Sequence, residues 1–238
     1  MFYAYCLSDE VTERMIAGVQ GIGGIAPRLF QLGEIAAVVS ELHEEGAPVV
    51  TRENVLAHER VLECVLAQTT PLPFRFGTMT GAERLQNYVA SQERRLKAAL
   101  ARVRSSVEMS VKIIWNLEEI KREELAQEAE AEGHGKAAGA GTQFLLAKRR
   151  EIIGDERLKM RAGELQAWLD KLLKDVVKES SSNVRPAEAL VLSASHLVER
   201  EQLESYRERL AAARGQHQEL RFLTSGPWPP YSFSDFSS

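Results

Sequence analysis

The residues best suited to acid–base or metal chemistry in this chain are its histidines. Their spacing matches no metal-binding or catalytic motif. No two of them stand four residues apart, and no cysteine lies near one at zinc-ligand spacing. His58 falls near the apolar stripe of an expected helix, and His196 alternates with Leu192 and Ala194 in an expected strand. These patterns predict partly buried, hydrogen-bonded histidines, with no catalytic residue and no metal site. The five are His43, His58, His134, His196 and His217.

A glycine-rich segment offers a second candidate chemistry. Residues 21–26, Gly-Ile-Gly-Gly-Ile-Ala, match a loose form of the dinucleotide-binding fingerprint. That fingerprint binds a pyrophosphate only where it follows a strand and begins a helix. Here it follows an expected helix and continues into Pro27 and an expected strand. We therefore interpret it as the end of a helix and predict no cofactor.

The other candidate functional residues are acidic side chains and one arginine. The chain has 34 acidic residues, so accidental carboxylate pairs are expected and their presence decides nothing. The run Glu118 to Glu128 is typical of a solvated helix face, with a partner-binding face as the alternative. Arg75 lies between Phe74 and Phe76 in a proline-bounded segment. Its position favours a structural role, and contact with a ligand or partner is the alternative.

The carboxyl-terminal segment carries aromatic residues on a proline frame. Pro227, Pro229 and Pro230 hold it extended, and the aromatic side chains of Trp228, Tyr231 and Phe233 are costly to leave in water. A disordered tail is usually poor in aromatic residues. We expect residues 227–233 to lie along a sheet edge or groove of a carboxyl-terminal domain, with Trp228 at least half buried.

The charge and hydropathy of the chain restrict the kinds of partner and the cellular location that we expect. The 238 residues carry a net charge of −4 with no basic stripe, which argues against a nucleic acid or an anionic lipid membrane as partner. No apolar run approaches the roughly 20 residues of a spanning helix, and the amino terminus does not resemble a signal peptide. Cys6 and Cys64 are far apart and indicate reduced thiols. The expected location is the cytoplasm.

The first part of the chain predicts a small α+β domain over residues 1–104. Its expected element order is βαββαβ followed by a helix, which suits a split-βαβ arrangement. Ser8 is the predicted N-cap of the first helix, Thr51 that of the second, and Thr80 to Glu83 form a predicted capping box for the third. The expected strands are residues 2–7, 28–32 and 34–42, with an extended segment to Phe76.

The remainder predicts a second α+β domain over residues 105–225, followed by a tail at 226–238. Residues 106–115 alternate apolar and polar side chains and form the clearest expected strand. Strands are also expected at 188–198 and 220–224, and helices at 117–130, 142–178 and 199–214. We interpret 133–141 as a flexible loop and Ser180 to Asn183 as a helix break.

Several of these segments together resemble the gas vesicle protein F/L family. The resemblance lies in residues 34–40, 54–59, 71–78, 107–112 and 226–233. It implies two α+β domains, the second ferredoxin-like with a helical insertion and an extended tail, although the sequence predicts one strand fewer. It also implies an accessory or minor structural protein that assists vesicle nucleation and assembly. The implied partners are the hydrophobic shell protein and other gas vesicle accessory proteins, and the implied location is the gas vesicle.

Two functions of different classes follow. In the first, the chain is not an enzyme and binds partners through Arg75, Phe76, Trp228, Tyr231 and Phe233. In the second, it is a ferredoxin-like regulatory protein that binds a small molecule. An enzyme with unfamiliar motifs is a further alternative. F and L members are too similar to separate from these residues.

Overall fold

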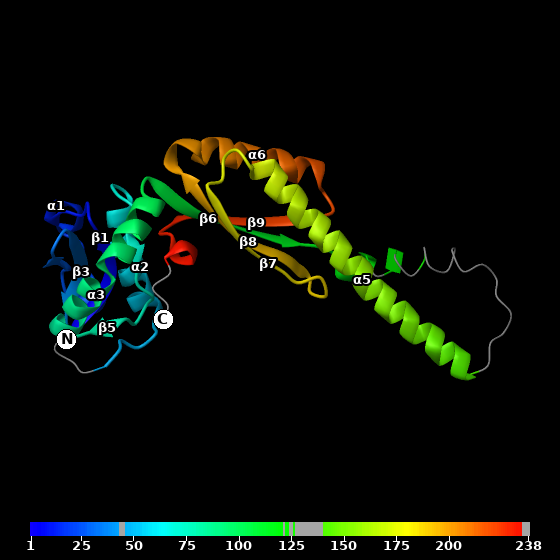
Figure 1. Cartoon of the computed structure of the whole chain (residues 1–238), viewed down its shortest axis with the longest axis horizontal. Helices are drawn as coiled ribbons and strands as arrows, with labels where there is room; N and C mark the ends of the chain where they lie inside the picture. The colour runs from blue at the N-terminus through cyan, green and yellow to red at the C-terminus, as the bar shows by residue number, and fades with distance from the viewer. Residues whose placement is uncertain (43–45, 121, 124–125, 127–139, 235–238) are drawn as a thin grey trace. The chain divides into compact units, whose positions relative to one another are not determined.

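The computed structural model describes residues 1–42, 46–120, 122–123, 126 and 140–234, and it describes no side chains at 140–154 (Figure 1). The chain divides into two compact units. The first unit comprises Met1–Met109, Leu197–Arg200 and Gly226–Ser238, and the second comprises Ser110–His196 and Glu201–Ser225. These units do not follow chain order, because two later segments return to the first. The division at 104/105 and the separate tail remain a prediction.

The first sheet is built around strand β1 (Phe2–Ser8), all seven residues of which are buried. β1 pairs antiparallel with β3 (Ile35–Glu41), which pairs with β2 (Arg28–Leu32). Two short strands, β4 (Leu72–Pro73) and β5 (Met79–Thr80), pair with the other edge of β1. The strand order is β2-β3-β1-β4, with β5 also on β1. A central strand must be apolar on both faces, which explains the absence of polar alternation in β1 and β3.

Two helices pack against the first sheet and form two apolar clusters with it. Helix α2 (Arg52–Leu66) packs with Tyr3 and Tyr5, whereas α3 (Ala82–Val103) packs with Phe2 and Ala4. Neighbouring β1 residues therefore face different helices, as the twofold repeat of a strand requires. The register shifts between Ala4 and Cys6, so Tyr5 and Cys6 contribute to the same cluster. Helix α1 (Glu13–Ile16) and the 3₁₀ turn η1 (Ile22–Gly24) connect β1 to β2.

The second sheet contains β6 (Ser106–Ile114), β7 (Glu179–Val184), β8 (Leu190–Glu199) and β9 (Arg221–Trp228), in the order β7-β8-β6-β9. Helix α5 (Ala140–Leu173) precedes β7. The 3₁₀ turn η2 (Arg200–Gln202) and α6 (Leu203–Gln216) lie between β8 and β9, and η3 (Tyr231–Phe233) follows. In both sheets the first and third strands in chain order are central, and the second and fourth are at the edges.

Several local predictions are confirmed and others are wrong. The strands expected at 2–7, 28–32, 34–42, 106–115 and 188–198 are present, and Thr51 Oγ1 accepts from the Asn54 amide at 3.2 Å. Ser8 does not cap a helix: it ends β1, and its hydroxyl accepts from the Glu10 amide at 3.1 Å. The predicted capping box is absent, because Thr80 pairs in β5 and Gly81 is the N-cap of α3.

The predicted break at Ser180 to Asn183 is instead strand β7, which is the strand missing from the sequence-based order. Its serines are exposed, so it shows no apolar alternation. Half of the helix expected at 117–130 lies outside the described residues, and its described residues (117–120, 122–123 and 126) are helical. Residues 133–139 of the expected loop also lie outside the described residues, and Ala140 and Gly141 belong to α5.

Candidate functional site

Phe76 and Tyr231, both predicted to bind a partner, meet at His58 in the first unit. Tyr231 Oη lies 3.2 Å from His58 Nε2, and the Phe76 ring is edge-on to the imidazole at 5.8 Å. Tyr3 Oη lies 2.8 Å from His58 Nδ1, and Tyr5 stacks on the same ring at 5.6 Å. We call these five residues the aromatic latch, because they join the carboxyl-terminal turn to α2 and β1.

The hydrogen bonds of the latch form one directed chain. The Gly77 amide donates to Tyr3 Oη at 3.1 Å, so the Tyr3 hydroxyl can donate to His58 Nδ1. The Tyr231 hydroxyl donates to Glu59 Oε1 at 3.4 Å, which leaves its oxygen to accept from His58 Nε2. Every polar atom in the series is therefore satisfied with a neutral imidazole. Burial lowers the pKa of His58 to about 4, although a hydrogen bond to the Phe74 backbone opposes it, and burial raises that of Tyr3 to about 12.

The residues after Tyr231 are fastened by further contacts within the first unit. Glu108, which is 6% exposed, accepts from the Ser232 amide and hydroxyl, both at 2.7 Å. Arg102 donates to the Phe233 carbonyl, and the Phe233 ring is buried in the cluster beneath α3. We expected residues 227–233 on the carboxyl-terminal domain. Ser232 does contact Glu108, within the range 105–225 predicted for that domain. The expectation is wrong for Tyr231 and Phe233, whose hydrogen-bond partners are His58, Glu59 and Arg102 in the range predicted for the first domain.

Arg75 and Trp228 remain at the surface. Arg75 is exposed, and its carbonyl accepts from the Thr78 amide at 3.2 Å and the Thr78 hydroxyl at 2.7 Å. No ion pair to its guanidinium occurs among the residues that the structure describes. Trp228 ends strand β9 and keeps 37% of its surface exposed, so it is more than half buried, as expected. These two side chains are available for contact with another molecule.

The glycine motif has a structural purpose. Its first residue, Gly21, precedes a 3₁₀ turn rather than a long helix. The Ile22 amide donates to Tyr5 Oη at 2.8 Å, and Tyr5 Oη lies 2.9 Å from Ser40 Oγ. A Cβ on Gly21 would lie 2.1 Å from Tyr5 Oη. The glycine therefore lets the turn close over Tyr5, and the segment lacks the helix amino terminus that a pyrophosphate would need.

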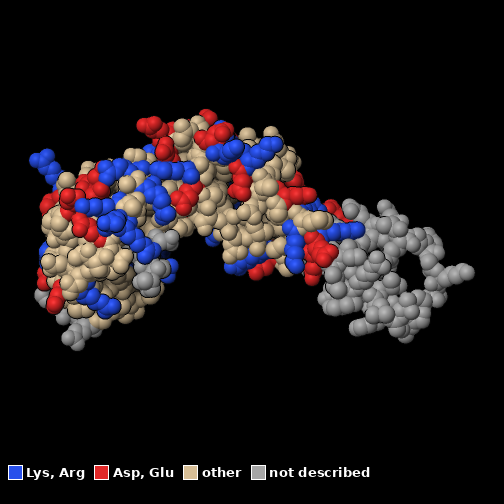
Figure 2. Space-filling view, viewed as in Figure 1, with Lys and Arg blue, Asp and Glu red and all other residues tan. Residues whose placement is uncertain are grey.

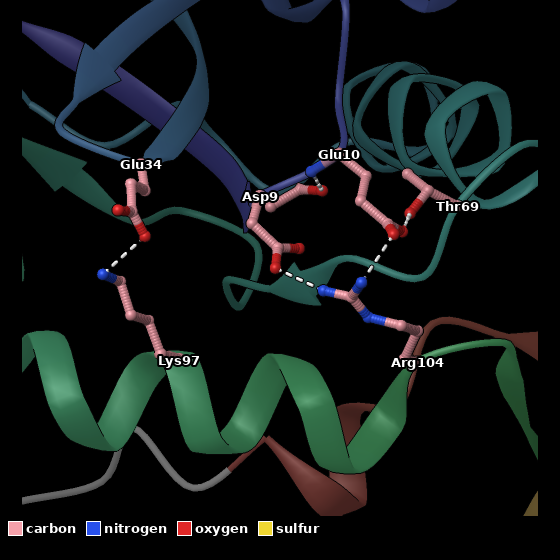
Figure 3. Close-up of polar contacts among 7 residues, drawn as sticks. Asp9, Glu10, Glu34, Thr69, Lys97 and Arg104 are labelled. Carbon is pink, nitrogen blue, oxygen red and sulfur yellow. Dashed lines mark hydrogen bonds and ion pairs between the residues drawn. The ribbon is translucent and has the colours of Figure 1, made fainter.

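Figure 3 shows a charged cluster at the end of α3 and the loop after β1. Arg104 contacts Asp9 at 2.5 Å and Glu10 at 2.9 Å, and the Thr69 hydroxyl donates to Glu10 at 2.7 Å. Lys97 pairs with Glu34 at 2.6 Å in the same view. Each acid in the cluster has a basic partner, which indicates that the cluster joins α3 to the sheet rather than serving acid–base catalysis.

Loss of the Arg104 contacts should therefore have a small and salt-dependent effect. We expect Arg104→Gln to lower the free energy of unfolding by about 1 kcal/mol or less, because the guanidinium is nearly half exposed. Urea unfolding at low and high salt would measure it, and the difference from wild type should shrink at high salt. Arg84→Gln on the same helix, at an exposed residue, is the matched control. A loss of several kcal/mol would contradict a surface role.

Other site classes receive no support from the described residues. No group of three or more potential metal-ligating side chains occurs among them. Within the same part of the chain, none of the helices has the length and apolar character needed to span a lipid bilayer. Figure 2 shows acidic and basic groups interspersed over the visible face. His196 is buried and lies 2.8 Å from Tyr206 Oη, so the prediction of a buried, hydrogen-bonded histidine is confirmed for His58 and His196. His43 and His134 lie outside the described residues.

Comparison with known proteins identifies the family. The family model described as gas vesicle synthesis protein GvpL/GvpF matches residues 1–235. The chain belongs to this family. Gas vesicle protein L of a Streptomyces species is 28% identical over 98% of this chain and 92% of its own length. Gas vesicle protein F2 of Halobacterium salinarum is 25% identical over 98% and 91%.

Solved structures of the family share the fold. The crystal structure of GvpF from Microcystis aeruginosa has a TM-score of 0.80 at 20% identity and covers 99% of both chains. That of GvpF from an Anabaena species has a TM-score of 0.83 at 19% identity and covers 100% of this chain and 99% of its own. The shared architecture is α+β with two antiparallel sheets. Family membership gives this chain a role connected with gas vesicles and association with other gas vesicle proteins. The family description names no catalysed reaction.

Proposed function

We propose that this chain assists vesicle nucleation and assembly by binding the hydrophobic shell protein. The observation that carries the proposal is the match to a gas vesicle synthesis family along residues 1–235. A protein that holds an aggregation-prone partner needs exposed apolar surface to bury against it. The structure offers such surface in the first unit.

The segment before α2 exposes two adjacent valines. Val49 and Val50 are 74% and 77% exposed, and Leu56 in the first turns of α2 is 49% exposed. The segment is held in place, because the Asn54 side-chain amide donates to the Val49 carbonyl at 2.9 Å. A fixed apolar segment loses less conformational freedom on binding than a mobile one. We propose that Val49 and Val50 contact the shell protein.

The five residues predicted from the sequence take two roles in this proposal. Arg75 and Trp228 touch the partner, since both have exposed surface. Phe76, Tyr231 and Phe233 act indirectly by fastening the carboxyl-terminal turn to the first unit. A substitution at Tyr231 would then reduce partner binding indirectly, by loosening the attachment of that turn to the first unit.

A co-expression experiment tests the valine surface. We expect the tagged chain to retain shell protein in the cleared lysate, and Val49→Ser with Val50→Ser to lower the amount captured roughly tenfold, because apolar burial is lost. Met160→Ser removes a 63% exposed apolar residue from the second unit and is the matched control. Capture should persist at high salt. If the folded wild-type chain captures no shell protein, the proposal fails.

We also infer that residues from β6 to β9 form a ferredoxin-like domain. The described elements run β6, α5, β7, β8, α6, β9, and the strand order β7-β8-β6-β9 suits a split βαβ arrangement. The first sheet has the same order in its first four strands. Two copies of one topology explain why the predicted element orders of the two halves are so similar.

A further inference from the structure

A cavity of about 410 Å³ opens in the second unit, in the size range of small-molecule sites. It is lined by residues just after β6, in the helical stretch that follows, along α5 and in the turn before β9. Its apolar lining includes Trp115, Trp168 and Leu165. Trp115 is held by its indole N–H, which donates to the Glu188 carbonyl at 2.9 Å, and Trp168 lies edge-on to His217 at 4.5 Å.

The polar lining of the cavity is dominated by carboxylates. Among the described residues that line it are four glutamates, one arginine and one histidine. Arg161 is engaged by Glu123 at 3.2 Å, and His217 Nδ1 lies 2.8 Å from Glu219 Oε1. Both basic groups are therefore already paired with an acid of the cavity. The remaining acids are Glu119 and Glu164.

These two remaining carboxylates have no basic partner within the described residues. Glu119 accepts from the neutral Asn116 side-chain amide at 2.9 Å, and no described basic side chain pairs with it. Glu164 projects from the exposed side of α5, and no hydrogen bond or ion pair to it occurs in the part of the chain that the structure describes. Carboxylates beside indole rings attract cations, since the face of an aromatic ring is also electronegative.

We propose that this cavity binds an organic cation, namely a guanidinium or ammonium group carried on an apolar chain. The apolar stem packs against Trp168 and Leu165, and the cationic end meets Glu119 and Glu164. An anion is disfavoured because glutamates outnumber the basic groups of the described lining, and Arg161 and His217 already contact Glu123 and Glu219. The cation is either a free small molecule or an arginine or lysine side chain of another polypeptide.

Nuclear magnetic resonance can test the cavity with an internal control. The chain has three tryptophans, of which Trp115 and Trp168 line the cavity and Trp228 belongs to the first unit. N-acetyl-argininamide should shift the indole N–H resonances of Trp115 and Trp168 and leave that of Trp228 unchanged. N-acetyl-citrullinamide has the same shape without the charge and should bind at least about tenfold more weakly.

Variants of the acids test the charge requirement. Glu164→Gln should weaken binding of N-acetyl-argininamide by about three- to tenfold, and Glu164→Lys should abolish it. Glu156→Gln, at an exposed position on the same helix outside the cavity lining, is the matched control. Trp168→Leu keeps an apolar side chain but removes the ring, and it should weaken binding by about three- to thirtyfold.

Two further ligands distinguish the source of the cation. Agmatine represents a free small molecule, and a capped peptide with one arginine between two leucines represents a polypeptide. Tighter binding of either supports the proposal and identifies the source. Equal binding of the citrulline analogue, or insensitivity to Glu164→Lys, would overturn it. Neither outcome depends on capture of shell protein, so failure here is distinguishable from failure of the assembly role.

Discussion

Replacing Gly226 with alanine should destabilise the first unit by about 3 kcal/mol or more, or release the carboxyl-terminal turn from it. The residue has φ of +116°, which L side chains rarely adopt. A Cβ there would lie 2.7 Å from the Glu108 carbonyl oxygen and 2.9 Å from Met109 Sδ. The first contact is with the backbone of β6, so no side-chain rotation can relieve it.

Thermal unfolding and limited proteolysis together measure this effect. For a chain of this length, a loss of about 3 kcal/mol lowers Tm by roughly 6–12 °C. If the turn is released instead, residues 226–234 should become a protease site that wild type lacks. Gly163→Ala is the matched control, because Gly163 lies in α5 with no atom near the added Cβ. The control should be neutral or stabilising by up to about 1 kcal/mol. Unchanged Tm and unchanged cleavage for Gly226→Ala would show that the close approach is wrong.

The strands with a buried face could be predicted from the sequence. The apolar run at 35–39 and the alternation at 106–115 both reflect burial, which is also what forms β3 and β6. Strand β7 could not be predicted, because its exposed serines resemble a loop. Helix α1 was predicted too early, since Ser8 followed by two acids is a helix-start pattern that β1 overrides by extending to Ser8.

The position of the carboxyl-terminal turn could be predicted only in part. Its proline and aromatic content indicated docking, and Phe233 is indeed buried. Its partners are far away in sequence: Glu108 is 124 residues before Ser232, and His58 is 173 residues before Tyr231. Local patterns carry no information about such distant pairs, so the contacts of Tyr231 with His58 and of Phe233 with Arg102 were not predicted.

The cavity of the second unit was not predicted. Trp115 and Trp168 lie in the segments 106–115 and 142–178, where the sequence predicts a strand and a helix, and an apolar side chain in either is ordinarily a core residue. One feature of the sequence does point to the cavity: Glu164 precedes Trp168 by one turn on the same helix. That spacing places both side chains on one face. It becomes informative only when the opposite wall, with Trp115 and Glu119, is known.

The largest expected pH effect comes from the two buried histidines, His58 and His196. Burial lowers the pKa of each to about 4 from an ordinary value of 6.5. Below pH 6.5 the unfolded chain gains protons that the folded chain does not. The free energy of unfolding should therefore be highest above pH 6.5 and fall as the pH drops towards 4, by up to about 3 kcal/mol for each histidine.

One of the groups near His58 also changes the pH dependence of the free energy of unfolding. The Tyr3 and Tyr231 hydroxyls and the Tyr5 and Phe76 rings surrounding His58 remain neutral across this range. Glu59, near the Tyr231 hydroxyl, has its pKa raised by burial, so its protonation at low pH favours the folded state. The Glu59 contribution therefore opposes the histidine effect near the acidic end of the range. The steepest loss of stability should occur between about pH 6 and pH 5.

Replacing His58 with asparagine separates the pH effect of the imidazole from that of the neighbouring groups. Asparagine can keep a hydrogen bond to the Tyr3 hydroxyl, which lies 2.8 Å from Nδ1, but cannot gain a proton. We expect His58→Asn to be less stable than wild type at pH 7 and to lose less stability between pH 7 and pH 5. His196→Asn should act in the same way through Tyr206, and the double variant should have the flattest profile. Urea unfolding measured across this range decides the matter: parallel profiles for wild type and the double variant would mean that neither imidazole is held neutral by the fold.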